Sequence, residues 1–566
     1  MSQKPFLSEL KAIVGRRNVH TRVAKLDRYR RGFRSGEGEA EAVVRPGRLV
    51  ELWGVLKACV IADRIIVMQA ANTGLTEGST PSGRYDRKVV IINTLRLNRV
   101  YLLRGGRQIV SLPGGTLHKL EKLLKPLGRQ PHSVIGSSCI GASVVGGVCN
   151  NSGGSLVKRG PAYTELSLFA QLGSDGRLNL VNHLGIELGE TPEEILDRLD
   201  RGAFSDAEVS DGPGRASDSG YPERVRDVDA PSPARFNADP ERLYEASGCA
   251  GKIVVFAVRL DTFPAEVGER VYYIGTNNPA DLTELRRRLL IELEALPISG
   301  EYLHRDTFDI ARVYGKDTLL MIHWLGTDYL PLFFSMKGEI DARLNKMAFL
   351  PTNLVDRSMQ LLSRLVPEVL PLRILEYRDS FEHHLILTMS TDAADGVEEI
   401  LREMLGDRGW FLCTVKEAKK AMLLRFAAAG AAVRYQAVHG DQVEDIIPLD
   451  IALRRNDRDW FELLPEEIEK DMTAKLYYGH FLCHVFHQDY VVRKGANAKL
   501  IKQRLLKLLD QRGAEYPAEH NVGHLYEAKP ELAAFYAELD PKNSFNPGIG
   551  MTSKQRRFSK HESKLC

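Results

Sequence analysis

Two glycine-rich segments in the first 160 residues constrain the fold more than any other feature of the chain. Residues 69–79 read QAANTGLTEGS and directly follow the apolar run IIVM, and more than half of residues 135–155 are Gly or Ser. So much backbone freedom is entropically costly, and it indicates that a ligand packs closely against the main chain. A concave row of backbone amides can hold a diphosphate without Lys or Arg. Neither G-x-G-x-x-G nor G-K-[ST] occurs, so the predicted nucleotide site is neither of Rossmann nor of Walker type.

Composition narrows the class of protein. A chain of 566 residues with 43% hydrophobic and 27% charged residues predicts a globular protein of several structural units. The 77 basic and 74 acidic residues are too evenly balanced for a nucleic-acid-binding protein. Seven scattered cysteines without a C-x-x-C pair favour a reducing compartment over a disulfide framework or a zinc site. We see no signal peptide and no apolar run near the ~20 residues of a membrane span, so we expect any membrane contact to be peripheral.

Hydrophobic periodicity predicts alternating strands and helices, typical of an α+β or α/β unit. The expected strands are 42–45, 65–69, 88–94 and 108–112, and the expected helices are 5–15, 49–62 and 116–127. Residues 205–235 are rich in Ser, Asp, Gly and Pro, and we expect an exposed loop there. A strand over 252–260 follows, and a strand over 271–276 with a helix over 281–293 begins a second domain.

Histidines concentrate near the C-terminus. His480, His484 and His487 lie in YYGHFLCHVFHQDY, and His520 and His524 lie in AEHNVGHLY. If the first stretch were one strand, alternation would put His480 and His484 on one face and His487 on the other. Histidine is the usual general base because its ordinary pKa is about 6.5. One or two of these side chains could instead be buried partners of backbone groups.

The chain resembles a known family along nearly its whole length, in stretches such as QAANTGLTEGSTP, NNSGGSLVKRGPAYTE, RFAAAGAAVRYQAVH and YPAEHNVGHLY. It is similar to the FAD-binding family of vanillyl-alcohol-oxidase type and, within it, to the bacterial quinone-dependent D-lactate dehydrogenases. This resemblance implies an α+β fold with a two-subdomain FAD-binding domain, an α+β cap domain and a membrane-binding insertion in the cap. The implied boundaries are 1–267 for the FAD-binding domain, 268–310 and 381–515 for the cap, 311–380 for the membrane-binding region, and 516–566 for a segment that returns to the FAD-binding domain and ends in a basic tail.

The resemblance implies non-covalent FAD. The first glycine-rich segment would contact it through Ala70, Ala71, Asn72, Thr73, Gly74, Gly78 and Ser79, and the second through Gly136, Ser143, Asn150 and Gly153. Gly251, Ile253 and Val254, which follow or end the ASGCAGK stretch, are weaker candidates for the adenine side. A covalent bond from Cys139 or Cys149 stays an alternative.

The resemblance also implies the chemistry. A hydride moves from C2 of D-lactate to the flavin, a base takes the hydroxyl proton, and quinone receives the electrons. The G-H-x₆-H motif and later Glu-His pair of D-2-hydroxyacid dehydrogenases are matched by His480, His487, Glu519 and His520. We expect His520 to be the base and the other three to line its pocket. In some relatives such residues bind a divalent metal, but CHVFHQ replaces the Gly-Asp-Gly-Asn stretch here, so we assign no metal.

A substrate carboxylate needs a cation, and Arg suits it because it can donate two parallel hydrogen bonds. Arg425 matches the carboxylate-binding Arg of the family, with Arg454 and Arg455 as alternatives. The small residues that follow Arg425 indicate close packing rather than exposure to solvent.

Residues 324–337, WLGTDYLPLFFSMK, group aromatic and apolar side chains beside Lys337, Arg343 and Lys346, which predicts an interfacial anchor to membrane phospholipid. The resemblance implies ubiquinone or menaquinone as acceptor, no nucleic acid, and a peripheral position on the cytoplasmic face of the cell inner membrane. Two alternatives remain. One is a soluble FAD-dependent dehydrogenase of another D-2-hydroxy acid, such as 2-hydroxyglutarate or glycolate, and the other is a membrane protein that binds FAD only for structure.

Overall fold

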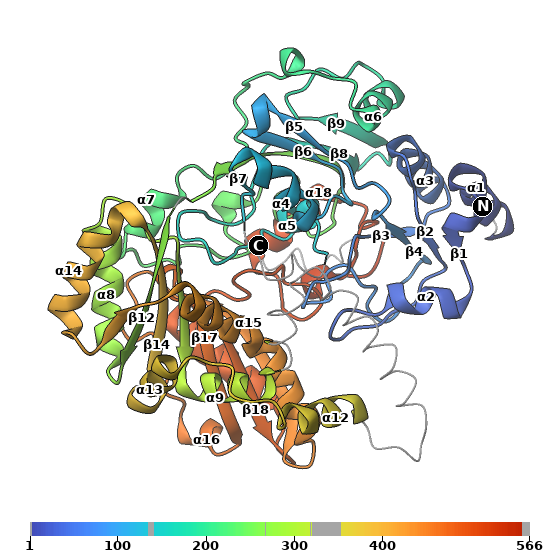
Figure 1. Cartoon of the computed structure of the whole chain (residues 1–566). Helices are drawn as coiled ribbons and strands as arrows, with labels where there is room; N and C mark the ends of the chain where they lie inside the picture. Colours follow the sequence, from blue (N-terminus) through green and yellow to red (C-terminus); the bar gives the residue numbers. More distant parts are fainter. Residues whose placement is uncertain (1–2, 134–140, 267, 317–318, 320–352, 557–566) are drawn as a thin grey trace.

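The computed structural model in Figure 1 describes residues 3–133, 141–266, 268–316, 319 and 353–556. Three sheets of four, five and seven strands organise these residues. The seven-stranded sheet lies to one side of the two N-terminal sheets (Figure 1). The domain boundaries expected from the sequence stay predictions, and the three sheets are compatible with them.

The first sheet has the strand order β1-β2-β4-β3. Its strands are β1 (Val19–His20), β2 (Ala42–Val44), β4 (Val89–Asn93) and β3 (Ile65–Gln69). β2, β3 and β4 run parallel, and helices cover both faces, which explains why these strands are apolar without alternation. Helices α1 (Gln3–Val14) and α3 (Leu49–Ile61) pack on one face, and α2 (Val23–Arg30) packs on the other.

The second sheet is antiparallel and has the strand order β5-β6-β10-β8-β9. Its strands are β5 (Val100–Leu103), β6 (Gln108–Ser111), β10 (Val254–Asp261), β8 (Ser167–Leu172) and β9 (Leu178–Asn182). Helices α4 (Leu117–Leu124) and α5 (Val144–Cys149) pack on one face, and α6 (Pro192–Arg201) packs on the other. A two-stranded pair, β7 (Arg129–Gln130) with β11 (Phe263–Pro264), extends this unit.

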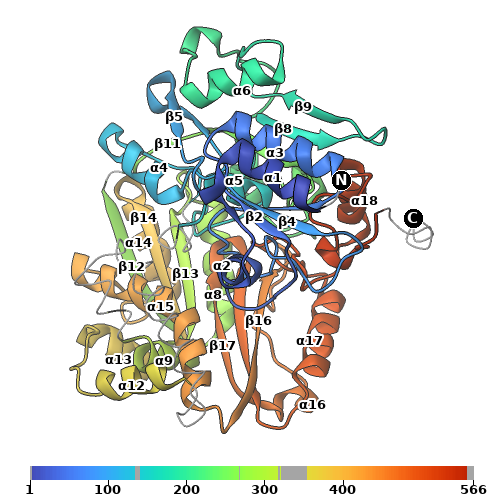
Figure 2. The same cartoon turned by 90° about the vertical axis from the view of Figure 1, so that its right-hand side faces the viewer.

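The third sheet is antiparallel throughout, in the order β15-β12-β14-β13-β17-β18-β16. Its strands are β15 (Trp410–Leu412), β12 (Glu269–Thr276), β14 (His383–Ser390), β13 (Ser299–His304), β17 (Met472–His480), β18 (Val485–Arg493) and β16 (Val443–Ala452). One face packs against α9 (Arg305–Tyr314) and α15 (Val415–Val438). The other packs against α8 (Pro279–Ile291), α14 (Ala394–Leu405) and α17 (Ala498–Arg512), as Figures 1 and 2 show from two sides.

The C-terminal segment returns to the first sheet after α18 (Pro530–Leu539). The backbone N–H of Ile66 donates to the carbonyl oxygen of Ser544, and that of Asn546 donates to Ile66, both at 2.9 Å. Phe545 between them is fully buried. Of the expected basic tail, Lys554 donates to the Ser82 carbonyl at 2.6 Å, and residues 557–566 lie outside the described part of the chain.

The expectation of an exposed loop over residues 205–235 is wrong in part. The short helix α7 (Tyr221–Arg226) forms inside it, and Tyr221 and Val225 are fully buried in the core beneath the third sheet. Val228 is also buried, so apolar side chains recur at i, i+4 and i+7 between polar residues. Pro and Gly supply the turns on either side, while three spaced apolar residues suffice to attach the segment.

The expected membrane anchor at 324–337 lies outside the described residues. The first two described helices after it are α12 (Leu354–Ser363) and α13 (Leu372–Ser380). Within the described part of the chain, none of the helices combines the length and the apolar character needed to cross a bilayer.

Candidate active site

The histidines of YYGHFLCHVFHQDY lie on a hairpin and not on a single strand. β17 ends at His480, residues 481–483 turn, and β18 begins at Val485. In the register of the hairpin His487 lies opposite Tyr478, and the ring centroids of His480 and His487 are 5.2 Å apart. The reversal of the chain brings these two imidazoles to the same face, which alternation along one strand would have forbidden.

Two buried carboxylates on the flanking strands face these imidazoles. Glu301 on β13 lies opposite His480, and its Oε1 is 2.7 Å from Nδ1 of that ring. Asp450 on β16 lies opposite His487, and its Oδ1 is 3.2 Å from Nδ1 of that ring. Each carboxylate thereby fixes the orientation of one imidazole and turns its Nε2 toward the centre of the cluster.

Glu519 lies at that centre. Its Oε2 is 3.4 Å from Nε2 of His480 and 3.9 Å from Nε2 of His487. Its Oε1 accepts a hydrogen bond of 2.7 Å from Arg235, which is 1% exposed. Arg235 also donates to the carbonyl oxygen of Gly154 in the second glycine-rich segment. The carboxylate therefore joins the histidines to the loops of the first domain.

The charges of this cluster hold one another in their ionised forms. Burial alone raises the pKa of Glu519, but His480 and Arg235 outweigh it and hold that pKa well below its usual range. Burial alone lowers the pKa of His480, but Glu301 and Glu519 outweigh it and raise the pKa to about 10. The two glutamates are thus stabilised as carboxylates next to a protonated imidazole.

The same three side chains could hold a divalent ion. One ligand atom from each of His480, His487 and Glu519 lies within 4.8 Å of the others. The carboxylates behind both Nδ1 atoms are the outer partners that metal-bound imidazoles usually have. The cluster is also balanced without an ion, because Glu301, Glu519 and Asp450 face two guanidiniums and a protonated His480. We therefore assign no metal to the cluster.

His520 lies at the edge of the cluster. Its side chain is 33% exposed, and its Nε2 is 3.9 Å from Oδ2 of Asp450. The same oxygen accepts the backbone N–H of Glu519 at 2.7 Å, so Asp450 holds the main chain that carries the Glu-His pair. An imidazole that is open on one side and has a carboxylate on the other can receive a proton from a ligand.

Arg425 reaches the cluster from α15. Its Nε is 2.9 Å from Oε2 of Glu301, although the N–H is not aligned for a hydrogen bond, and its guanidinium lies 4.7 Å from the centroid of the Tyr478 ring. Burial of most of its side chain leaves a cation beside the cluster. The guanidinium is therefore held in place by charge and by a ring, without being saturated by directional bonds.

The two alternative arginines, Arg454 and Arg455, make their contacts outside the cluster. Arg455 donates to the carbonyl oxygens of Ser232 at 3.0 Å and Arg224 at 2.6 Å, which secures the segment before the second sheet strand β10. Arg454 is exposed, and its carbonyl oxygen lies 2.9 Å from Nδ1 of His484. Neither guanidinium joins the cluster around Glu519.

Two of the histidines are structural. His484 is fully buried in the turn of the hairpin, and burial, followed by the charge of Arg286, holds its pKa well below the ordinary value. The backbone N–H of His524 donates to the carbonyl oxygen of Thr76, and burial lowers the pKa of its ring to about 4. His484 and His524 are therefore buried partners of backbone groups, which was the alternative role considered for one or two of the histidines.

The first glycine-rich loop leaves β3 and borders open space. Asn72 has a φ of 57°, and its side-chain amide donates to the carbonyl oxygen of Arg31 at 2.8 Å while its oxygen accepts from Ser79 at 2.8 Å. A Cβ built on Gly74 would meet no other atom within 4 Å. The candidate residues on this loop are Ala70, Ala71, Asn72, Thr73, Gly74, Gly78 and Ser79.

The second glycine-rich segment runs alongside the first. A Cβ built on Gly141 would lie 3.8 Å from the Cβ of Ala71. The Ser143 hydroxyl caps α5 by accepting the N–H of Gly146 at 3.0 Å. The expected contact at Gly136 lies outside the described residues.

The end of this segment connects it to the histidine cluster. A Cβ built on Gly153 would lie 2.5 Å from Oε1 of Glu519, so only Gly allows this approach. Asn150 accepts a hydrogen bond from Asn521, which follows the Glu-His pair. Two expected cofactor residues, Gly153 and Asn150, thus meet the expected catalytic residue Glu519 and the segment that follows it.

The weaker candidates lie where β10 begins. Gly251 has a φ of 80°, which favours glycine. Ile253 and Val254 are buried in different core clusters, on opposite faces of the sheet, so their side chains pack with protein. Only their main chain is left to contact a ligand. Of the two thiols considered for a covalent bond, Cys139 lies outside the described residues and Cys149 contacts Cys249.

Three residues of the cluster were not predicted from the sequence: Glu301, Asp450 and Arg235. The signal for the first two was an acidic residue inside an apolar strand, SGEYLH or IIPLDIA, because a buried charge requires a partner. Arg235 gave no signal, because it ends a Ser- and Pro-rich stretch that is typical of surface loops.

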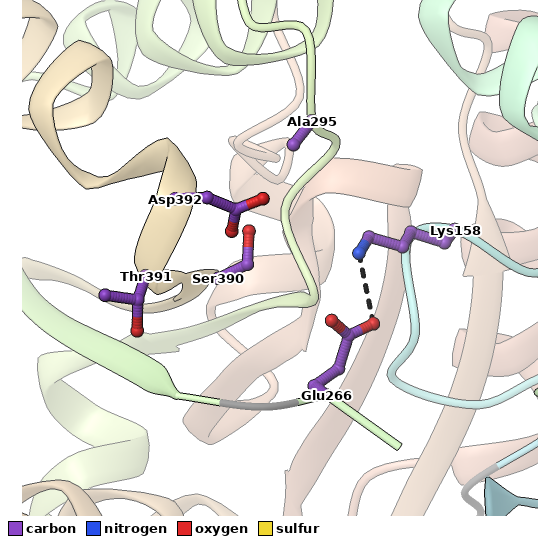
Figure 3. A pocket seen from close by; sticks show the side chains of 6 residues that line it. All are labelled: Lys158, Glu266, Ala295, Ser390, Thr391 and Asp392. Carbon is purple, nitrogen blue, oxygen red and sulfur yellow. Dashed lines mark hydrogen bonds and ion pairs between the residues drawn. The ribbon is translucent and has the colours of Figure 1, made fainter. Parts of the chain in front are cut away.

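A separate cavity of about 560 Å³ lies away from the cluster. Figure 3 shows its lining, in which Lys158 and Glu266 form an ion pair of 3.0 Å and Asp392 lies beyond them with Ser390 and Thr391. None of the candidate residues lines this cavity, and its charges are already paired or solvated. The cavity is therefore separate from the histidine cluster.

The chain matches one protein family along most of its length. A family model described as D-lactate dehydrogenase, membrane binding, matches residues 271–558. The chain is 60% identical over 564 residues to the quinone-dependent D-lactate dehydrogenase of Escherichia coli (strain K12), which covers 99% of this chain and 98% of that protein. It is 55% identical over 563 residues to the protein of the same name from Haemophilus influenzae, covering 99% and 100%.

Solved structures share the fold at low sequence identity. Alkyldihydroxyacetonephosphate synthase matches with a TM-score of 0.58 and 11% identity over 97% of this chain and 85% of that chain. p-Cresol methylhydroxylase matches with a TM-score of 0.57 and 12% identity over 97% of both chains. These likenesses confirm the expected fold class, an α+β architecture of vanillyl-alcohol-oxidase type.

Proposed function

The chain belongs to the quinone-dependent D-lactate dehydrogenase family, and from this premise we propose that it oxidises D-lactate to pyruvate with FAD as cofactor and a membrane quinone as acceptor. The observation that carries the proposal is the meeting of Arg425, the Glu519 cluster and His520 on one face of the third sheet. An anionic hydroxy acid needs both a cation for its carboxylate and a base for its hydroxyl, and these side chains supply the two.

Each residue has a part in this proposal. Arg425 binds the substrate carboxylate and exchanges part of its contact with Glu301 for two charged hydrogen bonds. His520 takes the hydroxyl proton, and Asp450 orients it. Glu519, His480 and His487 hold the floor of the site and exclude water from it. FAD, when bound, supplies the acceptor for the hydrogen from C2 of the substrate.

The glycine-rich loops fit FAD. A Cβ on Gly141 would lie 3.8 Å from Ala71, and a Cβ on Gly74 in the same loop as Ala71 would meet no other atom within 4 Å. The backbone turns at Asn72 and Glu77, with φ of 57° and 66°, curve the main chain so that its amides can line a concave site. Ala70, Ala71, Asn72, Thr73, Gly74, Gly78 and Ser79 would hold the diphosphate, and Gly136, Ser143, Asn150 and Gly153 would line the flavin.

A valine at Gly74 tests this assignment. The Gly74→Val variant meets no protein atom in the loop, so we expect it to fold with an unchanged melting temperature in the absence of cofactor. Its side chain would occupy the space left for FAD, so we expect at least a tenfold loss of FAD affinity, measured by flavin fluorescence on titration. Gly220→Val is the matched control, because a Cβ there would likewise meet no atom within 4 Å and the residue directly precedes α7, away from the loop. Full FAD affinity in Gly74→Val would contradict the assignment.

The membrane surface is the second element of the proposal. Leu361, Leu362, Leu365 and Leu372 are 62–81% exposed around the end of α12 and the start of α13. Four exposed leucines within twelve residues are unusual for a surface in water, and the exposed Arg357 and Arg364 lie among them. We assign this leucine patch to contact with phospholipid, with the enzyme held peripherally on the cytoplasmic face of the inner membrane.

Acidic substitutions in the leucine patch should release the protein from lipid. Burying a leucine contributes about 1.5–3 kcal/mol, so we expect the double variant Leu361→Asp/Leu365→Asp to bind anionic vesicles at least tenfold more weakly in a flotation assay. Ile61→Asp is the control, because Ile61 is 67% exposed on α3. Activity with D-lactate and a water-soluble quinone analogue should persist. Unchanged flotation of the double variant would show that the leucine patch does not contact the membrane.

A substrate panel separates the proposal from a soluble dehydrogenase of another D-2-hydroxy acid. Purified protein with phospholipid vesicles would be assayed with D-lactate, D-2-hydroxyglutarate and glycolate, using short-chain ubiquinone and menaquinone analogues. We expect the highest kcat/KM with D-lactate and quinone. A higher value for 2-hydroxyglutarate or glycolate, without stimulation by lipid, would favour the alternative.

A further inference from the structure

Two cysteines lie together beside the glycine-rich loops, and the proposed reaction uses neither. Cys149 ends α5, and Cys249 lies in the turn that precedes β10. The N–H of Gly248 donates to the carbonyl oxygen of Val148 at 3.0 Å, and that of Ala250 donates to Cys149 at 2.9 Å. These bonds bring the two main chains alongside each other, and the two thiols are in hydrogen-bond contact.

The turn around Cys249 is built to direct amides at its sulfur. Gly248, Ala250 and Gly251 have φ of 77°, 48° and 80°, and the value at Ala250 is one that residues with a side chain rarely adopt. The result is that the backbone N–H groups of Gly251 and Ile253 both donate to the Cys249 sulfur. Such a nest of amides stabilises an anion.

The two thiols therefore differ. Burial alone raises the pKa of Cys249, but the Cys149 thiol and the surrounding amides outweigh it and hold that pKa below the ordinary value. The hydrogen bond to Cys249, and then burial, raise the pKa of Cys149 well above it. The amides that face Cys249 make its sulfur the better placed nucleophile, and the adjacent Cys149 is placed to resolve it.

We propose that Cys149 and Cys249 form a reversible disulfide when the enzyme meets a hydroperoxide. The Cys249 thiolate attacks one peroxide oxygen, so that an S–O bond forms, the O–O bond breaks and the departing oxygen leaves as water after taking a proton. The Cys149 sulfur then attacks the Cys249 sulfur, so that an S–S bond forms, the S–O bond breaks, and the Cys149 proton leaves with the hydroxide as a second water. The two thiols lose two electrons in total, and the hydroperoxide gains them.

The position of the pair fits this role. Cys249 is fully buried and Cys149 only partly buried, so the pair faces solvent on the side of Cys149, at the end of α5. Cys413 is likewise partly buried, and burial raises its pKa to about 12. Since Cys413 lacks these amides, it serves as a comparison within the same chain.

Peptide mapping of the holoenzyme tests the proposal. Protein treated with hydrogen peroxide would be alkylated, digested without reductant and analysed by mass spectrometry. We expect peptides containing Cys149 and Cys249 to be joined, with the loss of two hydrogen atoms, at least tenfold faster than Cys413 is oxidised, and to separate again with dithiothreitol. Both cysteines remaining alkylated while Cys413 is oxidised would overturn the proposal.

Single variants test the order of the steps. In Cys149→Ser the sulfenic acid on Cys249 cannot be resolved, so we expect dimedone to trap it there. In Cys249→Ser we expect no dimedone adduct on Cys149. An adduct of equal yield on Cys149 would overturn the assigned roles. If a variant fails to fold, the kinetics of the unaltered holoenzyme decide, and they do so independently of whether D-lactate is the substrate.

Discussion

Replacing His520 with alanine should slow the reduction of the flavin by D-lactate by about 10²–10⁴-fold, the usual contribution of a general base. His520 is the most exposed imidazole of the cluster, and Asp450 lies 3.9 Å from its Nε2. Its loss removes the acceptor for the hydroxyl proton without creating a buried charge. Anaerobic stopped-flow measurement of flavin absorbance gives this rate directly, separately from quinone reduction.

Two controls show whether the effect of His520→Ala is chemical. The FAD content and the melting temperature should be unchanged, because the side chain lies at the edge of the cluster. His183→Ala is the matched variant, since His183 is half exposed on the distant second sheet unit and pairs with Glu245. A His520→Ala variant that reduces its flavin within tenfold of the unaltered rate would show that another group is the base.

Replacing Arg425 with methionine should lower kcat/KM for D-lactate by about 10²–10⁴-fold. Hydrogen bonds to charged groups contribute about 1.5–3 kcal/mol each, and a bidentate pair loses two of them. Most of the loss should appear as a higher KM, because the carboxylate is bound in both the ground state and the transition state. Arg425→Lys keeps the charge beside Glu301 but not the fork, so we expect it to recover only part of the loss.

The effect of the Arg425 variants on protein stability has to be measured separately from their effect on substrate binding. Methionine leaves Glu301 with His480 as its remaining partner, and breaking a buried ion pair costs about 3–5 kcal/mol. A lower melting temperature in Arg425→Met, but not in Arg425→Lys, is therefore expected. Arg454→Met is the control for loss of a nearby exposed arginine. An unchanged KM in both Arg425 variants would mean that the carboxylate is bound elsewhere.

Periodicity predicted several elements of the first two sheets and helix α8, but it gave bounds for none of the strands β13, β16, β17 and β18, which carry the histidine cluster. The parallel strands β2, β3 and β4 are continuous apolar runs bounded by loops, and α3, α4 and α8 have an apolar stripe, so local pattern and burial agree. Their positions follow from the residues themselves. The order of strands in the seven-stranded sheet did not, because it depends on pairings between distant segments, such as Glu301 with His480.

The residues of the site also fall into two groups, those that could be singled out from the sequence and those that could not. The Glu-His pair and the histidines of the hairpin could be singled out because their residue types carry chemistry. Glu301 and Asp450 gave only the weaker signal of an acidic residue in an apolar strand, because their role comes from lying opposite His480 and His487 on neighbouring strands. The hairpin itself was missed because His484 occupies a left-handed turn position, with φ of 54°, that glycine or asparagine usually marks.

The most direct test of the account is anaerobic mixing of the purified holoenzyme with D-lactate or L-lactate while the flavin spectrum is recorded. We predict that D-lactate bleaches the yellow absorbance, that L-lactate leaves it unchanged, and that a quinone analogue restores it. Equal bleaching by both enantiomers, or a colourless protein that does not take up FAD, would contradict the account.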